Sequence, residues 1–371
     1  MRCLVFGLHD TIGGVERYVA NVYPYLREKQ VYFDFISPFE HMALEEDFQE
    51  QGCVIYHVPN FKKSPIGYFV AIDRILRKQK YDVVYVNMLS AANVLPFILA
   101  KRCRTGRVIA HSHNNDTPSG MLRKLLHTLN IKIVERISTD FWACSKVAGQ
   151  WLFPDVSLAN IRVVPDAIDM SCFRYSEKSR KSLRKQLQIS DDSFVFGHVG
   201  RFEEQKNHEM LLKIFSLIRK KRANIILMLV GEGILMRKIC MQAESMGISD
   251  SVRFVGAVSD VSSYYSVMDA FLFPSKFEGF GMAVIEAQTS GLSCLVSDTV
   301  PVDVDITSVS HLSLGNLTDW VEKSEELAEI GPVLLEDRLQ RYTICENSKY
   351  SISRSADYLV HLFYSNMKGQ L

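Results

Sequence analysis

The chain has 371 residues, of which 47% are hydrophobic and 23% are charged. Its length exceeds the ~100–200 residues of a typical domain and favours two domains, while the ordinary composition, without long tracts of Gly, Pro or Ser, argues against a disordered protein. The apolar stretches are far shorter than the ~18 residues that indicate a membrane span, and the N-terminal run is too short for a signal peptide.

The charge distribution indicates which class of partner the protein could bind, and the cysteines indicate its redox compartment. The net charge of +1 hides an asymmetry, because residues 51–150 carry 15 Lys and Arg against 5 Asp and Glu. Either one face of the N-terminal half meets an anionic partner, such as a membrane surface or an acidic polymer, or this region is a basic solvated surface. The eight cysteines include no Cys-x-x-Cys pair, which favours a reducing cytosol and no zinc site over a disulfide framework.

Strand-like and helix-like segments alternate through the first half of the chain. A predicted strand over 2–8 leads through a glycine turn into a helix over 15–29, whose apolar residues recur at helical spacing. Further short apolar runs predict buried strands at 31–36, 53–56, 83–86 and 108–110. This alternation indicates a parallel sheet with helices on both faces.

The alternation of strands and helices is interrupted at 163–169. A polar helix is predicted over 177–187, and the alternation then resumes. The second half predicts strands at 194–199, 225–230, 252–255, 270–273 and 293–296, and helices at 207–221, 234–246, 261–267 and 281–290. We therefore predict an α/β protein of two doubly wound Rossmann-like domains facing a central cleft. The first would comprise 1–168 with a C-terminal helix over 352–371, and the second 169–351.

Two turns place candidate ligand-binding groups at the carboxyl ends of strands, where open α/β sheets bind ligands. Gly13-Gly14 joins the first strand to the first helix; the turn either offers backbone N–H groups to a ligand or is purely structural. In the second half, Arg201 and Lys206 follow a strand and could clamp a diphosphate, although both could also be ordinary surface charges.

The segment from Phe273 to Ala287 is more informative. A strand gives way to a loop containing Gly279 and Gly281, which let the backbone approach a ligand closely, and a helix begins at about Gly281. Glu278 and Glu286 flank this loop. Because carboxylates would repel a phosphate, they are better suited to accept hydrogen bonds from sugar hydroxyls.

The spacing of Glu278 and Glu286, with Gly-Arg-Phe-x-x-Gln-Lys-Asn about seventy residues upstream, resembles family 4 of the glycosyltransferases, which have the GT-B fold. The Gly13-Gly14 turn, Val163-Val164-Pro165 and Gly231-Glu232-Gly233 follow in the expected order. His-Ser-His-Asn at 111–114, with Ser297 to Pro301, resembles the branch that builds bacterial capsules and exopolysaccharides.

The resemblance implies roles for individual residues. Arg201 and Lys206 would hold the donor diphosphate, Glu286 the ribose, and the Glu278 loop the transferred sugar. His113 and Glu278 would be the catalytic residues, with His113 near the reacting carbon and His111 a strand-end core residue. The remaining implied donor-binding residues are Gly13, Gly14, Gly231, Gly233, Gly279, Phe280 and Gly281.

The resemblance also implies retention of the anomeric configuration by front-face attack, in which the leaving diphosphate helps to take the acceptor's proton. No metal or other cofactor would be required, because Arg201, Lys206 and a helix dipole neutralise the leaving group. Two departures stand out. Asp166-Ala167 replaces the usual Asn-Gly, which puts an interdomain contact in doubt, and Val302-Asp303 replaces a Lys-Glu pair.

The expected reaction is transfer of a hexose or N-acetylhexosamine from a nucleotide sugar, which we expect to be UDP-linked, to a lipid-linked oligosaccharide in the bacterial cytoplasm. The basic residues of 62–136, including a predicted helix over 121–136 with a broad apolar face, predict peripheral association with the anionic inner face of the cell membrane. No nucleic-acid partner is expected. Two alternatives stay open: a nucleotide-sugar 2-epimerase on the same fold, and a non-catalytic subunit that binds the donor.

Overall fold

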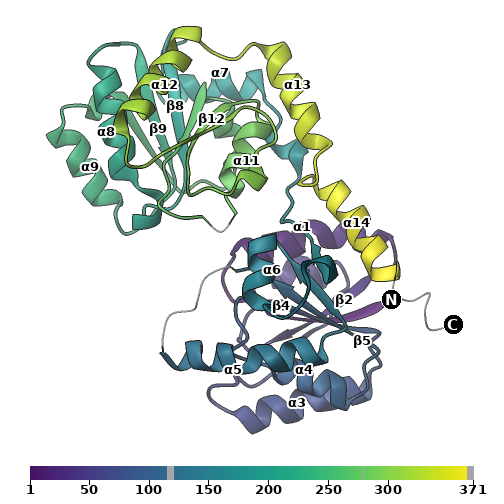
Figure 1. Cartoon of the computed structure of the whole chain (residues 1–371). Coiled ribbons are helices and arrows are strands. Elements are labelled where there is room, and N and C mark those ends of the chain that lie inside the picture. The colour runs from purple at the N-terminus through teal and green to yellow at the C-terminus, as the bar shows by residue number, and fades with distance from the viewer. Residues whose placement is uncertain (115–120, 279, 366–371) are drawn as a thin grey trace. The chain divides into compact units, whose positions relative to one another are not determined.

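The computed structural model describes residues 1–114, 121–278 and 280–365. It divides into two compact units (Figure 1). The first comprises Met1–Ile168 and the segment from Ile352, and the second comprises Asp169–Ser351. Each unit has its own parallel sheet and its own hydrophobic core, so each is described separately.

The sheet of the first unit has seven strands in the order β3-β2-β1-β4-β5-β6-β7. They are β1 (Arg2–Phe6), β2 (Tyr32–Ser37), β3 (Ile55–His57), β4 (Val83–Met88), β5 (Arg107–Ser112), β6 (Asp140–Ala143) and β7 (Ile161–Val163). The chain builds the sheet outward from β1 in one direction through β2, and in the other direction through β4, which pairs with β1 on its other side. Loops that follow β1 and β4 therefore meet at a topological switch point, where open α/β sheets bind ligands.

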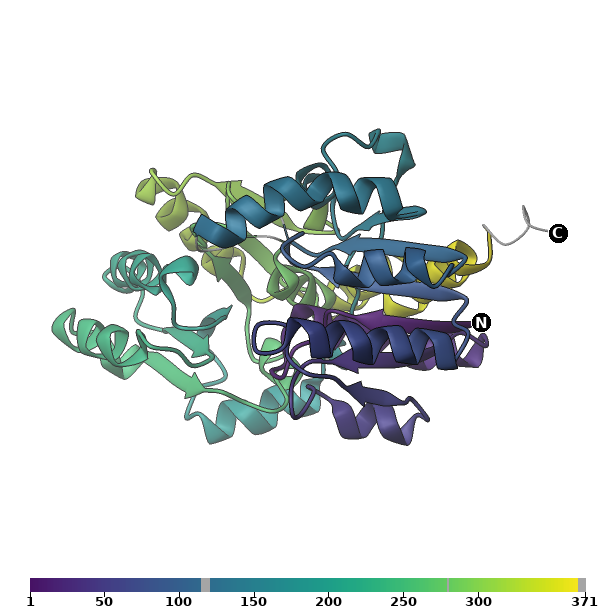
Figure 2. The same cartoon turned by 90° about the horizontal axis from the view of Figure 1, so that it is seen from below.

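Helices cover both faces of this sheet, as its continuously apolar strands require. One face is covered by α1 (Gly14–Glu28), α2 (Glu45–Glu50) and α14 (Ile352–Ser365). The other is covered by α3 (Pro65–Lys78), α4 (Leu95–Arg102), α5 (Met121–Ile137) and α6 (Lys146–Leu152). Figure 1 shows α3, α4 and α5 side by side, and Figure 2 looks at the unit from the side of this layer.

The sheet of the second unit repeats the arrangement with six strands in the order β10-β9-β8-β11-β12-β13. They are β8 (Phe194–Val199), β9 (Ile225–Val230), β10 (Val252–Gly256), β11 (Ala270–Phe273), β12 (Ser293–Ser297) and β13 (Val309–Leu312). The helices are α7 (Glu177–Gln186), α8 (His208–Arg219), α9 (Met236–Ser245), α10 (Ser262–Tyr265), α11 (Met282–Thr289), α12 (Leu317–Ile330) and α13 (Leu335–Glu346). In this unit the switch point lies between β8 and β11.

The predicted fold class is confirmed, since both sheets are parallel, doubly wound and of one order. The sequence pattern was least accurate at 261–267, where only a single helical turn, α10, forms. Residues 266–268 are buried instead in the approach to β11. No helix within the described ranges is both long enough and apolar enough to span a membrane.

Candidate active site

The two motif loops of the second unit lie side by side because β8 and β11 are neighbouring strands. The loop after β8 carries Arg201 and Lys206, and the loop after β11 carries Glu278. Hydrogen bonds join the loops at several points. The Gln205 side chain donates to the Phe277 carbonyl at 2.9 Å, the Lys276 amide donates to the Gln205 carbonyl at 2.8 Å, and the Asn207 side chain donates to the Pro274 carbonyl at 3.1 Å.

An ion pair between Lys206 and Glu278 also joins the two loops. Lys206 Nζ lies 2.6 Å from Glu278 Oε1 and 4.7 Å from the ring centroid of Phe273. The side chains are 17% and 7% exposed, so the ion pair is largely shielded from water. Arg201 differs, because its guanidinium is 72% exposed and pairs with Glu203 at 3.0 Å. The site therefore combines a largely buried, neutralised cation with a solvent-exposed one.

Glu286 lies in α11, the short helix that follows the Glu278 loop. Its Oε2 accepts a hydrogen bond of 2.6 Å from the hydroxyl of Tyr265, which lies at the end of α10. The helix begins after Gly281, which has a φ of +96° that favours glycine. Phe280 is buried against Tyr350, with ring centroids 5.3 Å apart. Gly279 lies outside the described residues.

Gly231 and Gly233 have a structural explanation that the sequence did not reveal. Both have positive φ angles, +137° and +158°. A Cβ atom at Gly231 would lie 2.2 Å from the Gly200 carbonyl oxygen, and one at Gly233 would lie 2.5 Å from that of Phe202. These glycines thus allow the loop after β9 to pack directly on the loop that carries Arg201.

Two buried histidines support the same loop. His208, the first residue of α8, stacks on Phe202 with ring centroids 4.0 Å apart and lies 4.9 Å from His198 of β8. Burial, together with the nearby Lys206 ammonium, lowers the pKa of His208 to about 4. Burial also lowers the pKa of His198 well below its ordinary value. Both rings are therefore neutral at physiological pH, which is compatible with the adjacent cation.

In the first unit, the Gly13-Gly14 turn begins α1. Glu16 accepts hydrogen bonds from the amides of His9 and Gly13, both at 2.9 Å, and this fixes the turn. A Cβ atom at Gly14 would meet nothing within 4 Å. Glycine at 14 is therefore not required by the packing of the protein itself, unlike glycine at 231.

His113 follows β5 and is held between two polar side chains. Its Nε2 lies 2.9 Å from Asn87 Oδ1, and its Nδ1 lies 3.6 Å from Asp166 Oδ1. The imidazole is only 1% exposed. His111 lies beneath it in the core, with ring centroids 4.0 Å apart. Burial, together with the proximity of His113, lowers the pKa of His111 well below its ordinary value, so His111 is neutral.

Several residues of the site were missed at the level of sequence. Tyr265 orients Glu286, and Ser297 and Thr299 both donate to the Ser275 carbonyl and so fix the loop after β11. In the sequence, Asp166 stands out only as a departure from a family pattern, and its contact with His113 leaves no signal there. The chain also contains an Asp-x-Asp sequence at 303–305, where Asp305 pairs with His311 at 3.0 Å. Within the described residues, no cluster of three or more His, Cys, Asp or Glu could hold a metal ion.

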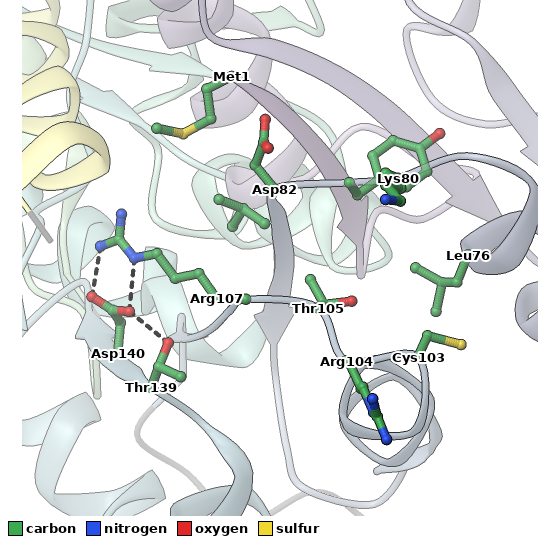
Figure 3. Close-up of a pocket in the computed structure, with 13 residues that line it drawn as sticks. Met1, Leu76, Lys80, Asp82, Cys103, Arg104, Thr105, Arg107, Thr139 and Asp140 are labelled. Atoms are coloured by element: carbon green, nitrogen blue, oxygen red, sulfur yellow. Dashed lines mark hydrogen bonds and ion pairs between the residues drawn. The ribbon is translucent and has the colours of Figure 1, made fainter. Parts of the chain in front are cut away.

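A cavity of ≈ 600 Å³ lies at the opposite, amino edge of the first sheet (Figure 3). The Arg107 guanidinium in its lining is engaged in hydrogen bonds that hold the fold together. The Arg107 guanidinium forms two hydrogen bonds to Asp140, at 2.8 and 2.6 Å, and donates to the carbonyls of Leu362 and Phe363 at the end of α14. This arrangement anchors α14 on the sheet. The motif residues of the first unit, Gly13-Gly14 and His113, lie at the carboxyl edge of the same sheet, at the other end of its strands.

A smaller cavity, of ≈ 220 Å³, lies at the carboxyl edge of the first sheet. Its lining includes Gly7, His9, Asn87, Asn93 and Arg123, and the last of these belongs to α5. It therefore shares Asn87 with the His113 site and joins that site to the start of α5.

The helix α5 has two apolar faces. His127, Ile131 and Val134 are buried in the core. On the opposite face, Met121, Leu122, Leu125 and Leu129 are 89%, 70%, 55% and 61% exposed. Arg123, Lys124 and Lys132 are exposed on the same helix. A cluster of exposed leucines beside cations is unusual on a solvated surface.

Two parallel, doubly wound sheets that repeat one strand order within a single chain are the architecture of the GT-B fold. Residues 12–171 match the family model of Glycosyltransferase Family 4, and residues 179–348 match that of Glycosyl transferases group 1. The chain belongs to these GT-B glycosyltransferases, as its sequence motifs predicted.

Relatives of known name support this placement. The chain is 29% identical over 330 residues to the putative glycosyltransferase EpsF of Bacillus subtilis, covering 86% of this chain and 85% of that protein. It is 23% identical to an Escherichia coli galactosyltransferase that is named for UDP-Gal and a GlcNAc-diphosphoundecaprenol acceptor, with 78% of each chain covered. Anabaena HepE, solved with UDP, has the same fold, with a TM-score of 0.81 and 16% identity over 98% of this chain and 100% of that one.

Proposed function

We propose that the protein is a retaining glycosyltransferase that moves a hexose or N-acetylhexosamine from a UDP-sugar to a lipid-linked oligosaccharide in bacterial capsule or exopolysaccharide synthesis. The observation that carries this proposal is the joined pair of loops after β8 and β11, which places Lys206, Glu278 and Arg201 at one switch point. The name of the E. coli relative, which includes a UDP-sugar and a diphosphate-linked lipid acceptor, supports the substrate classes.

In the proposed donor complex, the diphosphate binds to Arg201 and Lys206. Arg201 is solvent-exposed and needs only to leave an exposed partner, Glu203. Lys206 is neutralised by Glu278 before the donor arrives, which avoids a largely buried unpaired charge. When the diphosphate attracts Lys206, a Glu278 oxygen becomes available to accept a hydrogen bond from a hydroxyl of the transferred sugar. One pair thus serves both parts of the donor.

Glu286 is proposed to bind the ribose hydroxyls. The hydrogen bond from Tyr265 occupies one carboxylate oxygen and sets the orientation of the group. A carboxylate held in this way is a strong acceptor for a vicinal diol. The buried Tyr265 hydroxyl cannot ionise in competition, because burial raises its pKa well above the ordinary value.

The chemistry then depends on position and charge, as it does in phosphoryl transfer. The acceptor hydroxyl attacks on the face from which the diphosphate leaves, and a diphosphate oxygen takes its proton. Arg201 and Lys206 stabilise the charge on the leaving group, so the proposed reaction requires no metal or other cofactor. His113 is proposed to act near the reacting carbon.

The first unit is proposed to bind the acceptor. The ≈ 220 Å³ cavity at its carboxyl edge offers His9, Asn93 and Arg123 to sugar and diphosphate groups. Because Arg123 lies on α5, an acceptor in this cavity would be close to the exposed leucines of that helix. We propose that this face associates peripherally with the anionic inner surface of the cell membrane, where the lipid of the acceptor is embedded.

A donor screen followed by product analysis tests this function. Thermal shift with UDP-, GDP- and ADP-sugars should identify a UDP-sugar, and NMR of the product formed on a diphosphate-linked lipid acceptor should show a retained anomeric configuration. An inverted product would contradict the mechanism. Turnover of the UDP-sugar to an epimer without acceptor would indicate a nucleotide-sugar 2-epimerase instead.

A further inference from the structure

Asn87 determines which ring nitrogen of His113 carries a proton. The Asn87 side-chain nitrogen donates to the Phe6 carbonyl at 3.2 Å, and a carbonyl can only accept. The amide oxygen of Asn87 is therefore the atom that faces His113 Nε2, at 2.9 Å. Since that oxygen is also an acceptor, Nε2 must be the donor.

The other ring nitrogen faces a second acceptor. Nδ1 lies 3.6 Å from Asp166 Oδ1, and both atoms are buried without a hydrogen-bond partner among the described residues. If His113 were neutral with its proton on Nε2, the lone pair of Nδ1 would face a carboxylate. Two buried acceptors facing each other without a hydrogen would destabilise the folded protein. One additional proton between them removes this conflict.

The surrounding groups do not provide that proton or a competing charge. His111 of β5 is kept neutral by burial. Burial likewise raises the pKa values of Tyr18 of α1, Tyr85 of β4 and Cys144 after β6, and the Asp166 carboxylate raises each of them further, so all three stay protonated and uncharged. Among the side chains described around Asp166, His113 is the one that can become a cation.

We propose that His113 is an imidazolium whose Nδ1 proton is directed at the carboxylate of Asp166, which makes Asp166 a positioning residue for His113. The pair holds the ring between Asn87 and Asp166 and maintains a positive charge at the carboxyl edge of the first sheet. An Asn at this position, as in the family that the sequence resembles, would donate its own hydrogen to a neutral His113. The Asp of this chain therefore gives His113 a different charge.

Nitrogen NMR on the full-length protein tests this directly. With 15N-labelled histidine and His113→Gln to assign the signal, both ring nitrogens of His113 should resonate in the protonated range at neutral pH. In Asp166→Asn, Nδ1 should move to the unprotonated range while Nε2 stays protonated. An unprotonated Nδ1 in the wild-type protein would overturn the proposal, even if the variants failed to fold.

A kinetic measurement extends the test to the proposed function, on which it rests. Asp166→Ala should lower kcat by about tenfold or more with little change in donor KM, and Asp166→Asn should restore part of that loss. The alkaline decline of kcat in the wild type should be absent in Asp166→Asn. Equal kcat losses in both variants, with an unchanged alkaline limb, would contradict positioning by charge. If no glycosyl transfer occurs, the proposed function fails while the NMR result stands.

Discussion

The two sheets share one strand order but place charge differently at their carboxyl edges. In the second unit, Lys206 and Glu278 form a pair between two loops, and Arg201 is open to solvent. In the first unit, His113 is buried between Asn87 and Asp166. The proposed donor complex requires the first arrangement to exchange partners when the diphosphate binds, whereas the second is held by its neighbours without any ligand. One fold would thus support a site that rearranges and a site that is preorganised.

The largest expected effect comes from replacing Lys206, which is proposed to leave its partner Glu278 and bind the donor diphosphate. Lys206→Ala removes a cation from the leaving group and leaves Glu278 unpaired and largely buried. We expect kcat/KM to fall about 10²–10³-fold in a glycosyl-transfer assay. The matched control is Lys276→Ala in the same loops, whose exposed pair with Glu204 should matter less than about threefold. A Lys206→Ala enzyme with normal kcat/KM would contradict the donor assignment.

The pH dependence of stability tests whether burial keeps His208 neutral in the folded protein. The pKa of His208 is about 4 in the folded protein, against 6.5 for an ordinary exposed histidine, so the unfolded chain binds the additional proton between these values. Its contribution to stability is fully present above about pH 6.5 and is lost as the pH falls toward 4, for a total of about 3 kcal/mol. Unfolding midpoints measured from pH 7 to 4 should fall, and His208→Phe should reduce the decline.

An exposed histidine provides the control for this measurement. His361 on α14 is exposed, so His361→Gln should leave the pH dependence unchanged. If His208→Phe and the wild type lose stability in parallel below pH 6.5, the decline does not originate at His208.

Glu286 gives a smaller effect that separates donor binding from chemistry. Glu286→Ala should weaken UDP binding by about 10- to 100-fold in calorimetry, since it removes hydrogen bonds to a charged acceptor. Tyr265→Phe keeps the carboxylate and removes only the bond that orients it, so its effect should be smaller. Unchanged UDP affinity in Glu286→Ala would show that the ribose assignment is wrong.

The sequence predicted elements well and contacts poorly. Apolar periodicity located most strands and helices, because burial on both faces of a parallel sheet leaves a strong pattern. It did not reveal that Tyr265 meets Glu286, or that Asp166 meets His113. These contacts depend on which strands are neighbours. Gly231 was interpreted as a ligand contact, although its conformation is required by the carbonyl of Gly200.

The smallest expected effect concerns the exposed surface of α5. This surface belongs to the first unit, and only that unit is proposed to contact a membrane. Each exposed cation near an anionic surface contributes about 1 kcal/mol. The double variant Arg123→Gln/Lys124→Gln should therefore bind anionic vesicles about tenfold or more weakly in sedimentation at low salt, and high salt should reduce this difference. Lys213→Gln, an exposed lysine on α8 of the second unit, is the matched control.

The exposed leucines allow the electrostatic and apolar parts of this binding to be separated. Leu125→Ser removes apolar area that would enter the membrane interface, while Leu125 is exposed in the protein, so stability should change little. Its loss of vesicle binding should persist at high salt, in contrast to that of the charge variant. If wild-type protein binds neutral and anionic vesicles equally, or neither, α5 is not an anionic-membrane surface. The local excess of Lys and Arg would then be only a solvated basic face.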